Sequence, residues 1–108
     1  MTIKPITVAE MNKDQLQAAL RMALNSKEEV PDWWTPAALT VIWNIVDTHR
    51  IEFTRLDANR IGARILSDGR YFIGANHLEA AVRAFVAYRI GFRVSFDEGN
   101  TAELPDAY

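Results

Sequence analysis

Two stretches in which apolar residues recur at every second position constrain this fold more than any other feature. They span residues 51–56 and 60–65, and the polar segment Asp57-Ala58-Asn59 separates them. A period of two is typical of strands with one buried face, and a short polar segment between two such runs predicts a β-hairpin. A helix pattern does not fit residues 51–65.

The register of this hairpin follows from its loop. A three-residue loop at 57–59, with Asn59 in the left-handed conformation, pairs Phe53 with Ala63 on an apolar face. The same register pairs Ile51 with Ile65 and sets Glu52 opposite Arg64 on the other face. A loop of two residues would instead put Arg64 beside Phe53 among apolar side chains. We therefore expect the three-residue loop.

A third strand is expected directly after the hairpin. Ser67-Asp68-Gly69 indicates a turn, and Tyr71-Phe72-Ile73 has the composition of a strand. Asp-Gly suits either a two-residue or a three-residue loop, so the register of this second pair stays open. Leu56, Leu66 and either Phe72 or Ile73 leave the second face of the sheet partly apolar, so helices could cover both faces.

Three segments carry helix signals. Asn12 and Gln15 form a capping box ahead of an apolar stripe that runs from Leu16 to Leu24. Thr35-Pro36 predicts the start of a second helix that runs to about His49. This second helix is apolar around most of its circumference, which predicts burial on more than one side.

The third helix has the strongest start signal. Asn76 and Glu79 predict another capping box, and Gly91 predicts the helix end. The expected buried stripe consists of Leu78, Ala81, Val82, Phe85 and Val86. Arg83 and Arg89 are expected to project away from this stripe. Alternating Phe92, Val94 and Phe96 suggest a short final strand or an extended packing segment.

These elements predict an α+β fold. It has two N-terminal helices, a three-stranded antiparallel sheet, a third helix and a short C-terminal strand, with the helices packed on the sheet. A chain of 108 residues and 12.2 kDa can bury about two-thirds of its surface, which is enough for one core. We expect a single domain over residues 1–108, with a core at about 8–96 and an acidic tail at 97–108.

Composition narrows the function classes. The chain has no cysteine, which excludes disulfides, thiolate metal sites and a cysteine nucleophile. No apolar run is long enough for a membrane helix, and no signal peptide is visible at the N-terminus. We expect a cytoplasmic protein without a membrane partner. The net charge is −2, but residues 50–93 carry eight arginines against four acids.

The arginine-rich hairpin is one candidate site. Arg55, Arg60 and Arg70 lie close in sequence to the aromatic residue Tyr71 and to Phe72. Arginines beside stacking rings on a sheet can hold single-stranded nucleic acid. The alternative is that the acidic residues around the hairpin neutralise its arginines. The expected Glu52–Arg64 pair and the low isoelectric point favour that alternative.

The adjacent tryptophans Trp33 and Trp34 are a second candidate site. Trp34 directly precedes the expected helix cap and can pack back on Leu39, so we expect it to be structural. In an extended loop Trp33 points the opposite way, and one small core cannot cover both rings. We therefore expect Trp33 to be partly exposed, as an anchor for a protein partner or a second copy.

No catalytic or metal-binding pattern is visible. His49 and His77 are the two histidines, and neither has the spacing of a metal site. The serines fit no nucleophile motif, and the glycines fit no phosphate-binding loop. We expect no cofactor, no metal and no enzymatic activity.

A resemblance to a known family adds to this interpretation. The stretch from Asn76 to Val86, continuing to Gly91, resembles the closing segment of small phage proteins of the NinX-like family. Asp32, Trp34 and Pro36 are similar to that family's Asp-Trp loop and the helix after it. The likeness runs from Leu16 to about Val94. It implies a phage or prophage accessory protein in a bacterial host, and it supplies no catalytic residues.

Two hypotheses about function follow. The first is a small protein-interaction module that uses the tryptophan loop and a partly apolar sheet face. Its partner is another protein or a second copy of itself, which would make a homodimer. The second is a nucleic-acid-binding protein that uses the arginine-rich hairpin.

Overall fold

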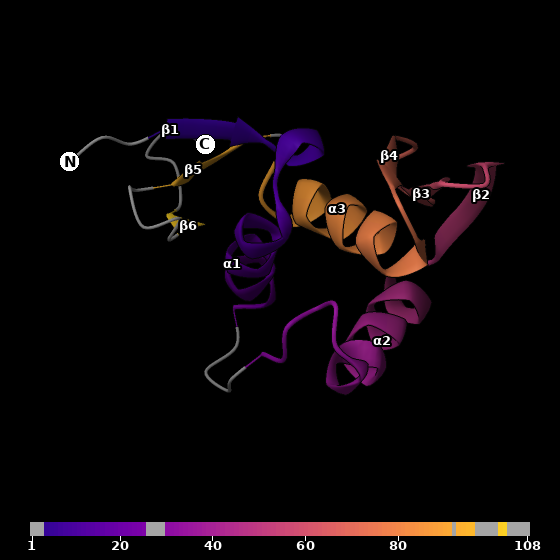
Figure 1. The fold of residues 1–108 in the computed structure, drawn as a ribbon, viewed down its shortest axis with the longest axis horizontal. Helices are drawn as coiled ribbons and strands as arrows, with labels where there is room; N and C mark the ends of the chain where they lie inside the picture. Colours follow the sequence, from indigo (N-terminus) through magenta and orange to yellow (C-terminus); the bar gives the residue numbers. More distant parts are fainter. Residues whose placement is uncertain (1–3, 26–29, 92, 97–101, 104–108) are drawn as a thin grey trace.

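The computed structural model describes residues 4–25, 30–91, 93–96 and 102–103, and it has the expected α+β fold. Its helices are α1 (Lys13–Leu24), α2 (Leu39–His49) and α3 (His77–Arg89). Short 3-10 helices at Val8–Glu10 and Pro36–Ala38 precede α1 and α2. The strands form two sheets, and α3 lies between α1 and the second of them (Figure 1).

The sheet of β2 (Ile51–Asp57), β3 (Arg60–Ile65) and β4 (Tyr71–Gly74) is antiparallel in that order. The expected hairpin register is confirmed: Phe53 pairs with Ala63, and Glu52 pairs with Arg64. The reason for it differs from the prediction. The expected three-residue loop at 57–59 is wrong, because Asp57 pairs with Arg60 and the turn consists of residues 58–59. Asn59 is not left-handed, and the extra residue is a bulge between Arg55 and Asp57. A bulge places one extra residue in one strand and so shifts the pairing by one residue. A turn that is one residue longer gives the same shift.

The open register of the second strand pair is now defined, with Ala63 opposite Phe72 and Arg64 opposite Tyr71. Phe72 is buried on the face beneath α3, whereas Tyr71 and Ile73 lie on the other face, 49% and 46% exposed. Among the described residues no helix covers that second face. The idea that helices cover both faces of the sheet is therefore wrong for this part of the chain.

A second sheet was not expected. β1 (Lys4–Thr7) pairs antiparallel with β5 (Arg93–Phe96), and β6 (Ala102–Glu103) pairs with β5. The final strand suggested by the alternation around Val94 is thus present, but it pairs with the N-terminal strand and not with the hairpin. Most of the expected acidic tail at 97–108 lies outside the described residues.

Side-chain caps explain where α1 and α3 begin, but the predicted start of the second helix at Thr35-Pro36 is wrong. Thr35 caps no helix amide and its hydroxyl donates to the Asp32 carbonyl instead, Pro36–Ala38 forms the 3-10 helix, and α2 begins at Leu39. The capping box of Asn12 and Gln15 is complete. At α3, Asn76 accepts a hydrogen bond from the amide of Glu79, but the expected return bond is absent. The carboxylate of Glu79 instead accepts from Arg83, at 2.9 Å. The second capping box is therefore only half formed.

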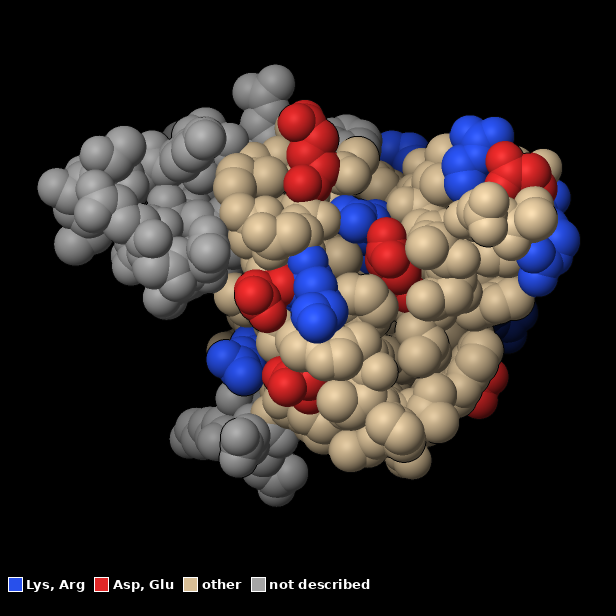
Figure 2. Space-filling model, viewed as in Figure 1, with Lys and Arg blue, Asp and Glu red and all other residues tan. Residues whose placement is uncertain are grey.

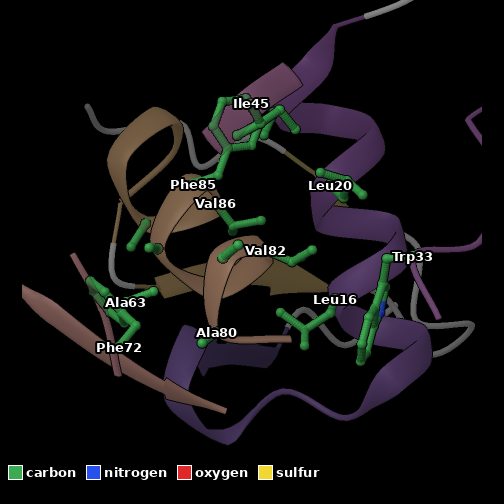
Figure 3. Packing of buried hydrophobic residues seen from close by; sticks show 14 of the residues in the cluster. Leu16, Leu20, Trp33, Ile45, Ala63, Phe72, Ala80, Val82, Phe85 and Val86 are labelled. Atoms are coloured by element: carbon green, nitrogen blue, oxygen red, sulfur yellow. The ribbon is translucent and has the colours of Figure 1, made fainter. Parts of the chain in front are cut away.

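The core lies around α3, which is buried on nearly all sides. Residues 80–87 are all buried, and Figure 3 shows Val82 and Val86 facing Leu16 and Leu20 of α1. Small alanine side chains at four of these eight positions let neighbouring elements approach the helix closely. This makes α3 the element on which the rest of the fold packs.

Arg83 corrects another expectation, because it lies inside this core. Its guanidinium donates to the carbonyls of Val8 and Met11, and to the carboxylate of Glu79. A buried arginine is tolerated only when its charge and donors are satisfied. Arg83 therefore ties α3 to the segment that leads into α1.

Candidate functional site

The structure contradicts the prediction for Trp33, the first of the two adjacent tryptophans. Trp33 is 5% exposed and belongs to the core, where it lies against α1 (Figure 3). Its indole Nε1 donates to the Lys13 carbonyl at 3.1 Å, and its amide donates to Gln17 Oε1 at 2.8 Å. Trp33 is therefore structural, and the hypothesis that it is an exposed anchor is wrong.

Trp34 is the more exposed of the pair, although part of its ring packs on the core. It meets Trp33 edge-on with 5.7 Å between ring centroids, and the Lys13 ammonium lies 4.5 Å from its ring. Cover from Lys13 and Trp33 leaves little of Trp34 to act as an anchor. The two rings fit one core because they pack edge to face and do not point in opposite directions.

Gln17 is the residue that the sequence reasoning missed here. It is buried in α1, and its Nε2 donates to the carbonyls of Val30 and Pro31 at 3.2 and 3.1 Å. With the bond from the Trp33 amide, it satisfies three backbone groups of the loop. The signal was a polar residue directly beside the apolar stripe of the first helix. This side chain holds the tryptophan loop on α1.

A different tryptophan is exposed. Trp43 of α2 is 43% exposed, and Leu39, one turn earlier, is 38% exposed. Val46, three residues later, is half-buried. We call Leu39, Trp43 and Val46 the α2 ridge, because positions i, i+4 and i+7 lie on one stripe of a helix. Leu39 and Trp43 are the exposed part of this ridge, whereas Val46 also packs against the core.

The ring of Trp43 is held in place from one side. It packs edge-on against Phe53 of β2, with centroids 6.1 Å apart. Phe53 in turn meets His77, the first residue of α3, at 4.9 Å. Three elements therefore converge on this aromatic cluster. An aromatic ring that is already oriented loses little side-chain entropy when it binds a partner.

The expectation that α2 is buried on more than one side is wrong. Only Ile42 and Ile45 of this helix are buried. Its composition is nevertheless that of a core helix, because Asp47 is the only Lys, Arg, Asp or Glu residue in it. Figure 2 shows the surface over α2, at the lower right, as almost entirely tan. An uncharged exposed helix face of this kind is typical of an interaction surface.

Three arginines on and beside the hairpin form ion pairs with neighbouring carboxylates. Arg60 meets Asp57, Arg64 meets Glu52 and Arg70 meets Asp68, each at 2.7 Å. The expected Glu52–Arg64 pair is thus confirmed. Hydrogen bonds from the Asn59 amide and the Arg60 guanidinium lower the pKa of Asp57, and the bond to Glu52 raises the pKa of Arg64.

The other hairpin candidates lie on the same sheet. Arg55 donates to the Asp57 carbonyl at 3.4 Å. The Arg64 guanidinium lies 5.1 Å from the centre of the Tyr71 ring, and a Cβ on Gly62 would lie 3.3 Å from that ring. Tyr71 therefore lies across Gly62 beside Arg64. This face carries an aromatic ring as expected, but its positive charge is largely paired.

The structure does not bring the two sets of sequence candidates together. The tryptophan loop packs on α1 and the arginines lie on the hairpin, on opposite sides of α3 (Figure 1). Within the described ranges no three His, Cys, Asp or Glu side chains gather as metal ligands would. Nor is any helix there long and apolar enough to cross a membrane.

Comparison with family models, with curated proteins and with solved structures found no match for this chain. The surface feature that bears most directly on function is therefore the α2 ridge, with its exposed and oriented Trp43 ring.

Proposed function

We propose that this chain is a small, non-catalytic protein-interaction domain that binds through the α2 ridge. The observation that carries the proposal is the exposed ring of Trp43, oriented by Phe53 on a helix face without charge. Tryptophan is the residue type most enriched among side chains that dominate binding energy. We also propose that the protein needs no cofactor and acts in the cytoplasm of a bacterial host.

The partner we assign to this ridge is a second copy of the same helix. The spacing of Leu39, Trp43 and Val46 is that of a helix seam, which packs well against another such seam. A two-fold axis requires a surface that complements itself. The ridge meets this requirement because Asp47 is the only formally charged residue in each copy of α2. Two copies therefore bring no run of like charges together across the axis.

Sedimentation velocity over a range of protein concentrations tests this pairing. We expect the wild type to self-associate as concentration rises. The double variant Leu39→Gln, Trp43→Gln should weaken association at least about tenfold, since loss of a dominant interface residue costs ~2 kcal/mol or more. A wild type that stays monomeric at every concentration would contradict the pairing.

A matched control uses exposed apolar residues elsewhere. Leu56 and Ile73 are 47% and 46% exposed, on the sheet and its hairpin. The double variant Leu56→Gln, Ile73→Gln makes the same change in polarity away from α2. We expect its association constant to equal that of the wild type. An equal loss in both double variants would mean that general surface apolarity, and not the ridge, drives association.

Nucleic-acid binding by the hairpin is the alternative function. The three ion pairs at 2.7 Å favour protein binding, because a phosphate would have to displace a carboxylate from each arginine. Fluorescence anisotropy with a mixed-sequence oligonucleotide at about 50 and 200 mM salt distinguishes the two. We expect no binding in either buffer. Binding that falls steeply with salt, and that Arg60→Gln weakens, would support the alternative.

A phage or prophage origin is part of the proposal and is supported by the NinX-like resemblance around Asn76 and Gly91. The identity of the neighbouring genes is the observation that tests this origin. Bacterial housekeeping genes on both sides would contradict it.

A further inference from the structure

A hollow of about 330 Å³ lies on the other flank of α2, where α1, α2 and α3 meet. Its apolar wall includes Leu24, Ile45 and Phe85, one residue from each helix. Figure 3 shows the Phe85 ring reaching toward Ile45. The volume is at the lower end of the range for ligand sites, about 300–1,000 Å³. The hollow therefore fits a small ligand with an apolar part.

Arg89 gives one side of this hollow a positive charge. It lines the hollow from the last turn of α3. Unlike Arg60, Arg64 and Arg70, it forms no ion pair with any described residue. A guanidinium at the edge of an apolar wall is suited to a carboxylate, which it can bind through two parallel hydrogen bonds.

His49 adds a second polar group. Its ring packs against Phe85 and Tyr88, with centroids 5.2 and 5.5 Å away, and it forms no hydrogen bond with a described residue. Burial, with a contribution from the charge of Arg89, lowers the pKa of His49 below 6.5. The imidazole is therefore neutral at pH 7 and has both a donor and an acceptor to offer.

We propose that this hollow binds a small monocarboxylate with an apolar tail. The carboxylate pairs with Arg89, the tail lies against Ile45 and Phe85, and His49 hydrogen-bonds the ligand between them. The site is separate from the α2 ridge, which lies on the opposite flank of the helix. Failure of the ridge proposal would therefore leave this one intact.

Three probes with the same six-carbon tail test the charge requirement: hexanoate, 1-hexanol and hexylammonium. Each is titrated into the full-length protein at pH 7.5 and followed by two-dimensional amide NMR. We expect hexanoate to bind most tightly and to shift the amides of Ile45, His49 and Arg89. Hexylammonium should bind most weakly because it meets Arg89 with a like charge.

Arg89→Gln is the deciding variant, and Arg55→Gln on the hairpin is its control for net charge. Arg89→Gln should weaken hexanoate binding about fivefold to tenfold, as expected for one partly exposed charge-assisted bond. It should leave 1-hexanol binding within about twofold. Arg55→Gln should change neither. The spectra of both variants also report whether the fold is intact.

Several results would overturn the assignment. One is equal weakening of hexanoate binding by both variants, which would indicate attraction to overall charge. Another is equal affinity for hexanoate and hexylammonium. A third is shifts confined to Leu66 and Tyr88, which line a neighbouring hollow on the other side of His49. Absence of any hexanoate-induced shift would also reject the site.

Discussion

Trp33 and Trp43 are the same residue type in opposite situations. Trp33 lies in a polar loop and is 5% exposed, whereas Trp43 lies in an apolar helix and is 43% exposed. Local sequence suggests the reverse for both. The difference teaches that exposure depends on what the fold places beside a residue and not on the polarity of its own segment.

The reason lies in hydrogen bonding and in space. Trp33 is buried because Gln17 and the Lys13 carbonyl satisfy the polar atoms that burial removes from water. Trp43 is exposed because α2 packs through Ile42 and Ile45, and one small core has no second layer for the opposite flank. The following predictions test this contrast.

The largest expected effect is on stability, from two matched substitutions. Trp33→Ala should lower the free energy of unfolding by about 3–5 kcal/mol, because it removes a buried ring and its hydrogen bond. Trp43→Ala should cost less than about 1.5 kcal/mol, since the side chain is already 43% exposed and its ring contact with Phe53 is worth about 0.5–1.5 kcal/mol. Urea denaturation of both variants measures this. Equal losses would break the comparison between the two tryptophans.

Gln17→Ala tests why Trp33 is buried. The substitution leaves the Trp33 amide and the carbonyls of Val30 and Pro31 without a partner, so it should cost about 2–4 kcal/mol. Gln15→Ala is the control in the same helix, because its bond to the Asn12 amide is exposed. That variant should lose about 1 kcal/mol or less. A Gln17 variant as stable as the control would show that water replaces the bonds.

Phe53→Leu tests how Trp43 is oriented. Leucine keeps the site apolar but removes the edge-on ring contact, which is worth about 0.5–1.5 kcal/mol. We expect a stability loss of that size, a shift of the Trp43 indole resonance in NMR spectra, and roughly threefold weaker self-association. An unchanged indole resonance would mean that Phe53 does not position the ring.

The smallest effect concerns pH and the other flank of α2. The pKa of His49 is lowered in the folded protein, so between that value and 6.5 the unfolded chain binds more protons. Stability should therefore fall as pH falls through this window, and His49→Gln should lose this component. An NMR titration should place the His49 midpoint below 6.5. A midpoint above 6.5 would contradict burial of the ring.

Much of the fold could be predicted because its signals are local. The caps at Asn12 and Asn76 and the alternation around Phe53 each depend on residues within a few positions of one another. The bulge that replaces a left-handed Asn59 was missed, since both solutions give the same register. The pairing of β1 with β5 was also missed, because it joins residues some 90 positions apart.

The candidate site was less predictable. Trp33 was predicted to be the exposed ring and is buried, whereas Trp43 lies in a helix whose apolar composition predicted burial and is exposed. Arg83 was expected outside and lies inside, where the carbonyls of Val8 and Met11 receive its protons. Neither partner is visible from the neighbourhood of Arg83 in the sequence.

By itself, the sequence determined the α+β class, the starts of α1 and α3 and the pairing of Glu52 with Arg64, because short-range sterics and hydrogen bonds decide them. Only the tertiary structure decided which tryptophan faces solvent, which arginines are neutralised and that Arg89 and His49 line one hollow. These outcomes depend on cover and charge supplied by residues far away in the chain. Burial is a property of the whole packing arrangement, and no local pattern contains it.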